Sequence, residues 1–220
     1  MVDNGHDSIR NILVEGIASL NLTVNEQHIE QLLAFIYLIE KWNKAYNLTA
    51  IKNNKDMVSL HLLDSLTVIP YLEGQRIIDI GTGAGLPGIP LAICLPQFSF
   101  TLLDSNSKKT RFVQQAVLEL KLSNVEIIHS RAEDYQPDNL FSTVLTRAFA
   151  ELSDIIESTK HLLSKNGKMI AMKGRCTESE LTQVLAKKTV IPVYIPGINA
   201  ERNLVCIHCN EENVGKEKVI

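Results

Sequence analysis

The chain changes its hydrophobic and polar pattern near residue 72. Before that point, apolar side chains recur every three or four positions, most clearly between Leu32 and Trp42, which predicts an amphipathic helix. Thr23 and Glu26 stand three residues apart just before this run, the spacing of a capping box at a helix start. Two shorter helices are expected beside it, over residues 8–20 and 55–68, with Pro70 ending the second. This part of the chain is therefore predicted to be a helical extension.

After Gly74 short apolar runs alternate with amphipathic stretches, which predicts a parallel sheet with helices on both faces. Only a short loop rich in Pro, Gly and Asn separates the last two runs, so they should pair antiparallel. The expected strands are residues 76–80, 98–103, 125–129, 143–146, 168–172, 190–195 and 204–209, and the expected helices are residues 108–120, 151–163 and 178–187. As domains we expect the helical extension over residues 1–72, a core over residues 73–210 and a disordered polar tail over residues 211–220, in one compact unit.

Charge and hydropathy then exclude several classes of protein. The 220 residues carry a net charge of −3, so any contact with RNA must rest on a local basic patch rather than on a basic protein as a whole. The apolar runs are too short to span a bilayer, and no basic start followed by an apolar run marks a secretory signal. We expect a cytoplasmic protein that makes no membrane contact. The sequence does not address assembly, and we expect a monomer.

A glycine-rich turn after the first expected strand carries the first chemical signal. Four glycines fall within eight residues there, and glycines let a backbone turn tightly and approach a ligand closely. Gly83, Gly85 and Gly88 match the dinucleotide-binding fingerprint. Gly81, Gly83 and Gly85 match the looser turn of methyltransferases. The turn therefore predicts a bound adenosine-type cofactor without choosing between the two classes of enzyme.

Acidic residues at the next two strand ends support that cofactor. Asp104 ends the second expected strand, where a carboxylate can accept hydrogen bonds from both ribose hydroxyls; it could also cap the helix that follows. Residues 130–134 follow the third strand, at the edge where methyltransferases usually hold adenine. The antiparallel last strands, and the lack of a second catalytic domain of the kind that dehydrogenases use, favour a methyltransferase. The predicted fold is therefore α/β, the Rossmann-like class I S-adenosylmethionine-dependent methyltransferase fold with seven strands and an antiparallel last strand.

Several polar residues are candidates for substrate contact. Lys173 and Arg147 end the fifth and fourth strands at the same edge as the glycine turn, and Arg147 could bind the cofactor carboxylate or an RNA phosphate. His61 and Asp64 lie three residues apart on one helical face, where a surface pair or a cap interaction is as consistent as a direct role. The basic side chains that open the next helix are expected to face solvent; they are Lys108, Lys109 and Arg111.

The sequence predicts no metal site. Cys206 and Cys209 are three residues apart on an expected strand, so they point to opposite faces, and no second Cys pair completes a zinc site. His208 shares the face of Cys206, but one Cys and one His do not make a structural zinc site.

Six blocks of sequence, in the same order, resemble the bacterial ribosomal RNA small-subunit methyltransferase G family, also called glucose-inhibited division protein B. The blocks are residues 42–50, 61–66, 81–90, 147–150, 172–174 and 201–204. The runs Gly-Leu-Pro-Gly-Ile-Pro and Arg-Ala-Phe-Ala are the most specific, and the resemblance extends over roughly residues 8–209. Asn203 stands where many members of the family carry His.

The resemblance implies transfer of a methyl group from S-adenosyl-L-methionine to N7 of guanine 527 in the 530 loop of 16S ribosomal RNA. The implied cofactor contacts are Gly81, Gly83, Gly85, Leu86, Asp104, Ala132, Glu133 and Arg147. The RNA-binding candidates are Asn47, His61 and Asp64, and the catalytic candidates are Lys173 and Arg202. The partner would be 16S ribosomal RNA, free or in the small ribosomal subunit. The alternatives are a methyltransferase acting on another RNA or a small molecule, and a non-catalytic nucleotide- or RNA-binding module.

Overall fold

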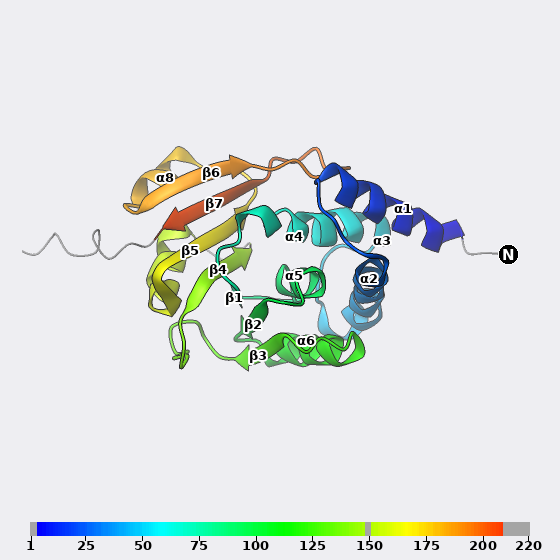
Figure 1. Cartoon of the computed structure of the whole chain (residues 1–220), viewed down its shortest axis with the longest axis horizontal. Helices are drawn as coiled ribbons and strands as arrows, with labels where there is room; N and C mark the ends of the chain where they lie inside the picture. Colours follow the sequence, from blue (N-terminus) through cyan, green and yellow to red (C-terminus); the bar gives the residue numbers. More distant parts are fainter. Residues whose placement is uncertain (1–3, 148–150, 209–220) are drawn as a thin grey trace, which may run out of the picture.

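A seven-stranded sheet forms the centre of the computed structural model, which describes residues 4–147 and 151–208 (Figure 1). The strands are β1 (Arg76–Ile80), β2 (Ser99–Asp104), β3 (Val125–His129), β4 (Phe141–Arg147), β5 (Leu163–Lys173), β6 (Lys187–Pro192) and β7 (Asn203–His208). They lie in the order β3-β2-β1-β4-β5-β7-β6. Strands β1 to β5 are parallel, and β7 runs antiparallel to both β5 and β6. The predicted fold class and the antiparallel last pair are confirmed.

Strand boundaries show where local pattern is sufficient and where it is not. The bounds of β1 and β3 agree with the prediction, while those of the other strands differ at one or both ends. One difference concerns the helix expected over residues 178–187, because α8 (Glu178–Gln183) ends early and β6 begins at Lys187. Lys187 pairs with His208 in the sheet, so the partner strand decides where β6 begins. Lysines at the start of an edge strand also discourage pairing with another chain.

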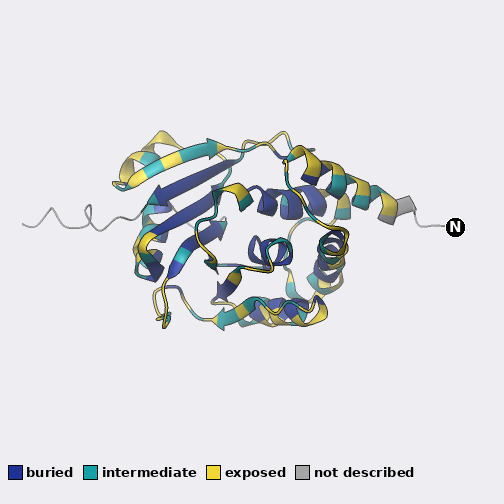
Figure 2. Ribbon diagram, viewed as in Figure 1, coloured by how far each residue is buried: buried dark blue, intermediate teal, exposed yellow. Residues whose placement is uncertain are grey.

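Helices cover both faces of the sheet. Besides α8, the α-helices are α1 (Asn4–Ser19), α2 (Glu26–Tyr46), α3 (Asn54–Met57), α4 (Asp64–Leu66), α5 (Gly88–Cys94), α6 (Ser107–Glu119) and α7 (Leu152–Thr159). Two short 3₁₀ turns are η2 (Ile69–Tyr71) and η3 (Lys160–Leu162). Helices α1, α2, α5 and α6 pack together on one face, and α7 packs on the other. In Figure 2 the inner strands are buried, whereas the outer sides of the helices are half-buried or exposed.

The start of α2 differs from the predicted capping box. The N-cap is Asn25, whose side-chain oxygen accepts a hydrogen bond from the backbone N–H of His28 at 2.8 Å. Thr23 is exposed and lies two residues before the cap. Because Asn is among the best N-cap residues and already satisfies one of the free N–H groups, Thr23 and Glu26 are not needed as a capping pair.

The helix expected over residues 55–68 contains a wider turn. Helical structure runs from Asn54 to Leu66, but its middle, η1 (Val58–Leu63), is a π-helix. Pro70 lies in the 3₁₀ turn that follows, so the expected end is confirmed. Short π-helical turns are often found at functional sites, and this one carries His61 towards the sheet edge.

The N-terminal helices share a core with the sheet. Phe35 of α2 and Phe112 of α6 are fully buried, and their rings stack with centroids 6.5 Å apart. Gly16 of α1 lies so close to Leu63 that a Cβ there would stand 2.3 Å from a Leu63 methyl carbon. The domain boundary near residue 72 stays a prediction. None of the described helices is both long and apolar enough to cross a membrane.

Candidate active site

A cavity of about 490 Å³ opens at the carboxyl ends of β1, β2, β3 and β4. Its wall contains the glycine turn, Asp104, the segment 130–133 and Arg147. Ligands of open α/β folds bind at this edge of the sheet. The structure thus brings together most of the residues for which cofactor contact is predicted.

The three glycines of the turn have different surroundings. Gly81, Gly83 and Gly85 all have positive φ angles, between 60° and 81°, a backbone conformation that side chains disfavour. A Cβ on Gly83 would find its nearest neighbours 3.8 Å and 3.9 Å away, at ordinary van der Waals distance and without a clash. A Cβ on Gly85 would stand 2.6 Å from Ile89 of α5. Gly81, Gly83 and Leu86 line the cavity, whereas Gly85 allows the turn to approach α5.

Asp79, which the sequence analysis did not single out, holds the turn in place. Its Oδ2 accepts hydrogen bonds from the Thr82 hydroxyl at 2.7 Å and from the Gly88 N–H at 2.9 Å. Complete burial raises the pKa of Asp79 to about 6, against the effect of these two hydrogen bonds. An acid inside an otherwise apolar strand is the signal that could have identified it.

Asp104 connects two neighbouring loops at the cavity wall. Its Oδ2 accepts a hydrogen bond from Gly83 N–H at 2.9 Å, and its Oδ1 accepts one from Asn106 N–H at 2.8 Å. The N-cap of α6 is Asn106, whose side chain accepts from Lys108 N–H at 3.0 Å. The alternative in which Asp104 caps this helix is therefore wrong.

The rest of the cavity lining combines predicted and unpredicted residues. Ala132 is buried and Glu133 is exposed at the rim. Lys109 also lines the cavity, so the prediction that it simply faces solvent is wrong, because the first turn of α6 points towards Gly83. Thr49, which was not predicted either, lines the cavity from the loop after α2.

A second cavity of about 400 Å³ adjoins the first. His61 and Arg147 line both cavities, which shows that the two share a wall. Asp64, Lys173 and Arg202 line the second cavity alone. Residues from the helical extension, β4, β5 and the start of β7 thus meet at one place.

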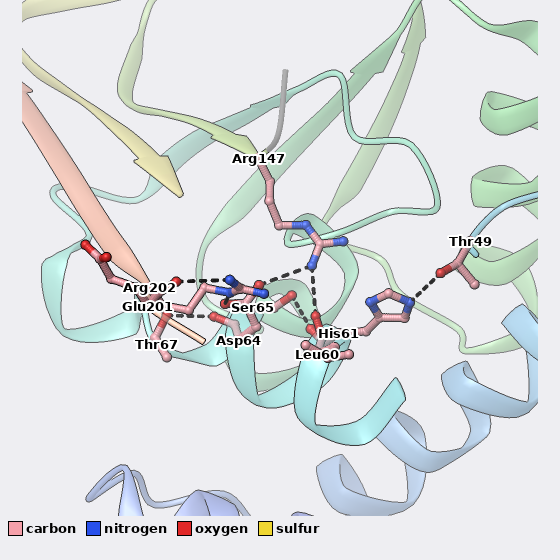
Figure 3. A network of polar contacts seen from close by, with 9 residues as sticks. All are labelled: Thr49, Leu60, His61, Asp64, Ser65, Thr67, Arg147, Glu201 and Arg202. Carbon is pink, nitrogen blue, oxygen red and sulfur yellow. Dashed lines mark hydrogen bonds and ion pairs between the residues drawn. The ribbon is translucent and has the colours of Figure 1, made fainter. Parts of the chain in front are cut away.

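A polar network connects the two cavities (Figure 3). Arg147 Nη1 donates to the Leu60 carbonyl at 3.2 Å and to Asp64 Oδ2 at 3.3 Å, and Arg202 Nε lies 3.7 Å from Asp64 Oδ1. Burial raises the pKa of Asp64, although both guanidinium groups oppose that shift. Asp64 is an ion-paired group inside the site, so its interpretation as a surface residue is wrong.

His61 is buried in the same network, so the alternative of a surface pair is wrong for it as well. Its Nε2 lies 2.9 Å from the Thr49 hydroxyl oxygen. Burial, with the nearby Arg147 charge as a smaller cause, lowers the pKa of His61 to about 4. The imidazole is therefore neutral at physiological pH.

Two predicted residues have structural contacts of their own. Lys173 forms an ion pair with Glu180 of α8 at the edge of the second cavity. Asn47 is exposed, caps the C-terminus of α2 with φ 50°, and lines neither cavity, so its contact with RNA stays a prediction.

Cys206 is buried in β7, and Cys209 lies outside the described residues. Within those residues no group of three His, Cys, Asp or Glu side chains could hold a metal ion.

Solved structures share this fold. The magnesium protoporphyrin IX methyltransferase from Synechocystis PCC 6803, solved with bound S-adenosylmethionine, superposes with a TM-score of 0.54 over 85% of this chain and 99% of that one, at 16% identity. An S-adenosylmethionine-dependent methyltransferase from Aquifex aeolicus superposes with a TM-score of 0.53 over 70% and 92% of the two chains, at 16% identity. The fold is therefore that of the S-adenosylmethionine-dependent methyltransferases.

Sequence relatives identify the branch within that class. Residues 28–206 match the GidB family, described as rRNA small subunit methyltransferase G. The ribosomal RNA small subunit methyltransferase G of Nitrosococcus oceani is 49% identical over 203 residues, which are 90% of this chain and 95% of that protein. The protein of the same name from Marinobacter nauticus is 47% identical, over 89% and 92% of the two chains. The chain belongs to the rRNA small subunit methyltransferase G family.

Proposed function

We propose that this chain transfers the methyl group of S-adenosylmethionine to N7 of a guanine in 16S ribosomal RNA. The observation that carries the proposal is the pair of adjoining cavities in a member of this family. One cavity has the walls of a nucleoside site and the other is lined by three basic side chains, Arg147, Lys173 and Arg202. A substrate in the ribosome places the proposed activity in the cytoplasm, and we expect the chain to act as a monomer.

The first cavity fits the cofactor. Each carboxylate oxygen of Asp104 accepts one backbone hydrogen bond, and because each oxygen can accept two, both remain able to bind a ribose hydroxyl. Gly83 lines the cavity without a side chain, which would allow a ligand to lie against its backbone. The cavity volume of about 490 Å³ also falls within the range of small-molecule sites. Gly81, Gly83 and Leu86 would contact the cofactor from one side, with Ala132 and Glu133 opposite them.

The proposed reaction needs positioning rather than a general base. S-adenosylmethionine supplies a methyl group that is already electrophilic because it is bonded to a sulfonium. Guanine N7 carries a free lone pair at neutral pH. The chain must therefore orient the base and exclude water, and such positioning can contribute about 7–11 kcal/mol. This requirement agrees with a second cavity that contains orienting side chains.

The basic side chains of the second cavity suit an RNA ligand. Arg147 and Arg202 converge on the single carboxylate of Asp64, so the group of three keeps an excess positive charge. Guanidinium groups bind phosphates and base edges through several N–H donors at once. A local positive site of this kind is what a chain with a net charge of −3 needs in order to bind RNA.

Transfer of labelled methyl from S-adenosylmethionine tests the proposal. Small ribosomal subunits and free 16S RNA would be offered separately, and the modified base mapped in each. We expect label at N7 of one guanine, and no label when that guanine is replaced by 7-deazaguanine, which lacks N7. Label on another RNA, on a small molecule or on protein alone would refute the proposal and favour another substrate.

A further inference from the structure

His61 lies at the wall between the two cavities and has an unsatisfied nitrogen. The side chain is 5% exposed and lines both cavities. Figure 3 shows the ring between Thr49 and the guanidinium of Arg147. One ring nitrogen, Nε2, contacts the Thr49 hydroxyl, whereas the buried Nδ1 has no hydrogen-bond partner among the described residues. Buried polar atoms nearly always have a partner, so a group absent from the apo chain is expected to bind Nδ1.

The contact with Thr49 suits one tautomer of the neutral imidazole. The Thr49 oxygen accepts a hydrogen bond from Ile51 N–H at 3.1 Å, and its hydroxyl proton can be donated to Nε2 of His61. A neutral imidazole that accepts at Nε2 carries its proton on Nδ1. Asn43 holds Thr49 in place, because its side chain makes two hydrogen bonds of 2.9 Å to the backbone of Thr49. In that tautomer Nδ1 is a donor without a hydrogen-bond acceptor among the described residues.

Guanine offers an acceptor at the place where this donor lies. On its major-groove edge guanine presents N7 and O6 side by side, both as acceptors, whereas adenine presents N7 beside an amino group. The lone pair of N7 must remain free to attack the methyl group, so a donor that reads this edge has to bind O6. An N–H donor at the same position would face the amino group of adenine, and two donors repel each other.

We propose that His61 determines the specificity of the reaction by donating a hydrogen bond from Nδ1 to O6 of the target guanine. The inference rests on the proposed function, since it names the group that selects guanine in that same site. Thr49 acts as a positioning residue, because its hydroxyl keeps the proton on Nδ1. The π-helix η1 places the ring at the wall shared by the cavity proposed for the cofactor and the cavity proposed for the RNA.

The experiment compares two bases at the target position. Ribosomal RNA would carry either guanine or 2-aminopurine, which keeps N7 but lacks O6, in the substrate form that the parent methylates. The ratio of kcat/KM for guanine to that for 2-aminopurine is measured for the parent and for His61→Ala. Loss of a hydrogen bond to a buried polar group supports a ratio about ten-fold smaller for His61→Ala, which corresponds to about 1.4 kcal/mol. The matched control is His28→Ala, a half-buried histidine near the start of α2, which should keep the parent ratio.

Two further variants keep the test decisive if His61→Ala does not fold. His61→Asn retains an N–H donor close to the Cβ, as Nδ1 is, and should restore part of the ratio. Thr49→Val removes the hydroxyl and should lower the ratio without removing the imidazole. A ratio that stays within two-fold of the parent in His61→Ala, or in Thr49→Val where His61→Ala is inactive, would overturn the inference. Failure of the parent to methylate any guanine of 16S RNA would instead overturn the proposed function.

Discussion

Replacing Asp104 with Asn would change the number of hydrogen-bond acceptors in the first cavity while keeping the side-chain size. In the parent, one carboxylate oxygen accepts Gly83 N–H at 2.9 Å and the other accepts Asn106 N–H at 2.8 Å. An amide has only one acceptor oxygen, and its amino group would face one of these two N–H donors. The variant must therefore either leave a backbone N–H without its partner or move one of the two loops.

The expected losses in stability and in cofactor affinity follow from counting these contacts. A buried donor left without a partner costs about 1–3 kcal/mol, so the free energy of unfolding should fall by roughly that amount. Cofactor binding should lose one charge-assisted hydrogen bond to a ribose hydroxyl, worth about 1.5–3 kcal/mol. The Kd for S-adenosylmethionine should consequently rise roughly 10- to 100-fold.

Isothermal titration calorimetry with S-adenosylmethionine measures the affinity, and urea unfolding measures the stability. Asp134→Asn is the matched control, because Asp134 is exposed, lies in the loop after β3 and does not line the cavity. It should bind like the parent. A Kd for Asp104→Asn within two-fold of the parent would refute the assignment of Asp104 to the ribose, and unchanged stability would refute the described hydrogen bonds.

Three other changes should have separable effects. Gly83→Ala places a Cβ on the cavity wall at φ 60°, without a clash inside the protein, so calorimetry should show much weaker cofactor binding while urea unfolding shows a loss of only about 1–2 kcal/mol. Gly88→Ala places a Cβ 2.1 Å from a methyl carbon of the fully buried Leu102, so unfolding should become easier by about 1–3 kcal/mol; unchanged stability would contradict this packing. The pKa of His61 is about 4 in the folded chain and near 6.5 when unfolded, so the unfolded state takes up the proton first as the pH falls. Between pH 6.5 and 4 the parent should lose up to about 3 kcal/mol that His61→Asn does not lose, and parallel urea curves for the two proteins would contradict a buried neutral imidazole.

Most of the sheet could be predicted because its signals are local. The apolar run of β1 and the polar residues on either side of it fix that strand without reference to any partner. Lys187 shows the opposite case, since only its pairing with His208 makes it part of a strand. The π-helix η1 was not predictable either, because one wider turn hardly alters the three-to-four spacing of the apolar side chains.

The residues of the site also divide into those that could be predicted from the sequence and those that could not. Gly81, Gly83 and Asp104 were predictable because the carboxyl ends of parallel strands meet at one edge of the sheet. Residues that follow two such strands therefore lie close together, although they are far apart in the sequence. Asp64 was a predicted candidate, but its burial was not predictable, because it depends on two guanidinium groups from the distant strand β4 and the loop before β7. Asp79 differs again: its place in an apolar strand was a signal of burial, but its partners, the Thr82 hydroxyl and the Gly88 N–H, could not be read from the sequence.

Arg147 lines both cavities and shifts the pKa of two neighbouring residues, Asp64 and His61. Its guanidinium favours the charged form of Asp64 and the neutral form of His61, because a second buried cation beside it would be repelled. Nη1 donates to the Leu60 carbonyl and to Asp64, and among the described residues no hydrogen bond engages Nη2 or Nε, so these are donors that could bind a ligand. The cofactor carboxylate and an RNA phosphate therefore need not compete for Arg147, since one arginine on a shared wall has enough donors to bind a ligand in each cavity.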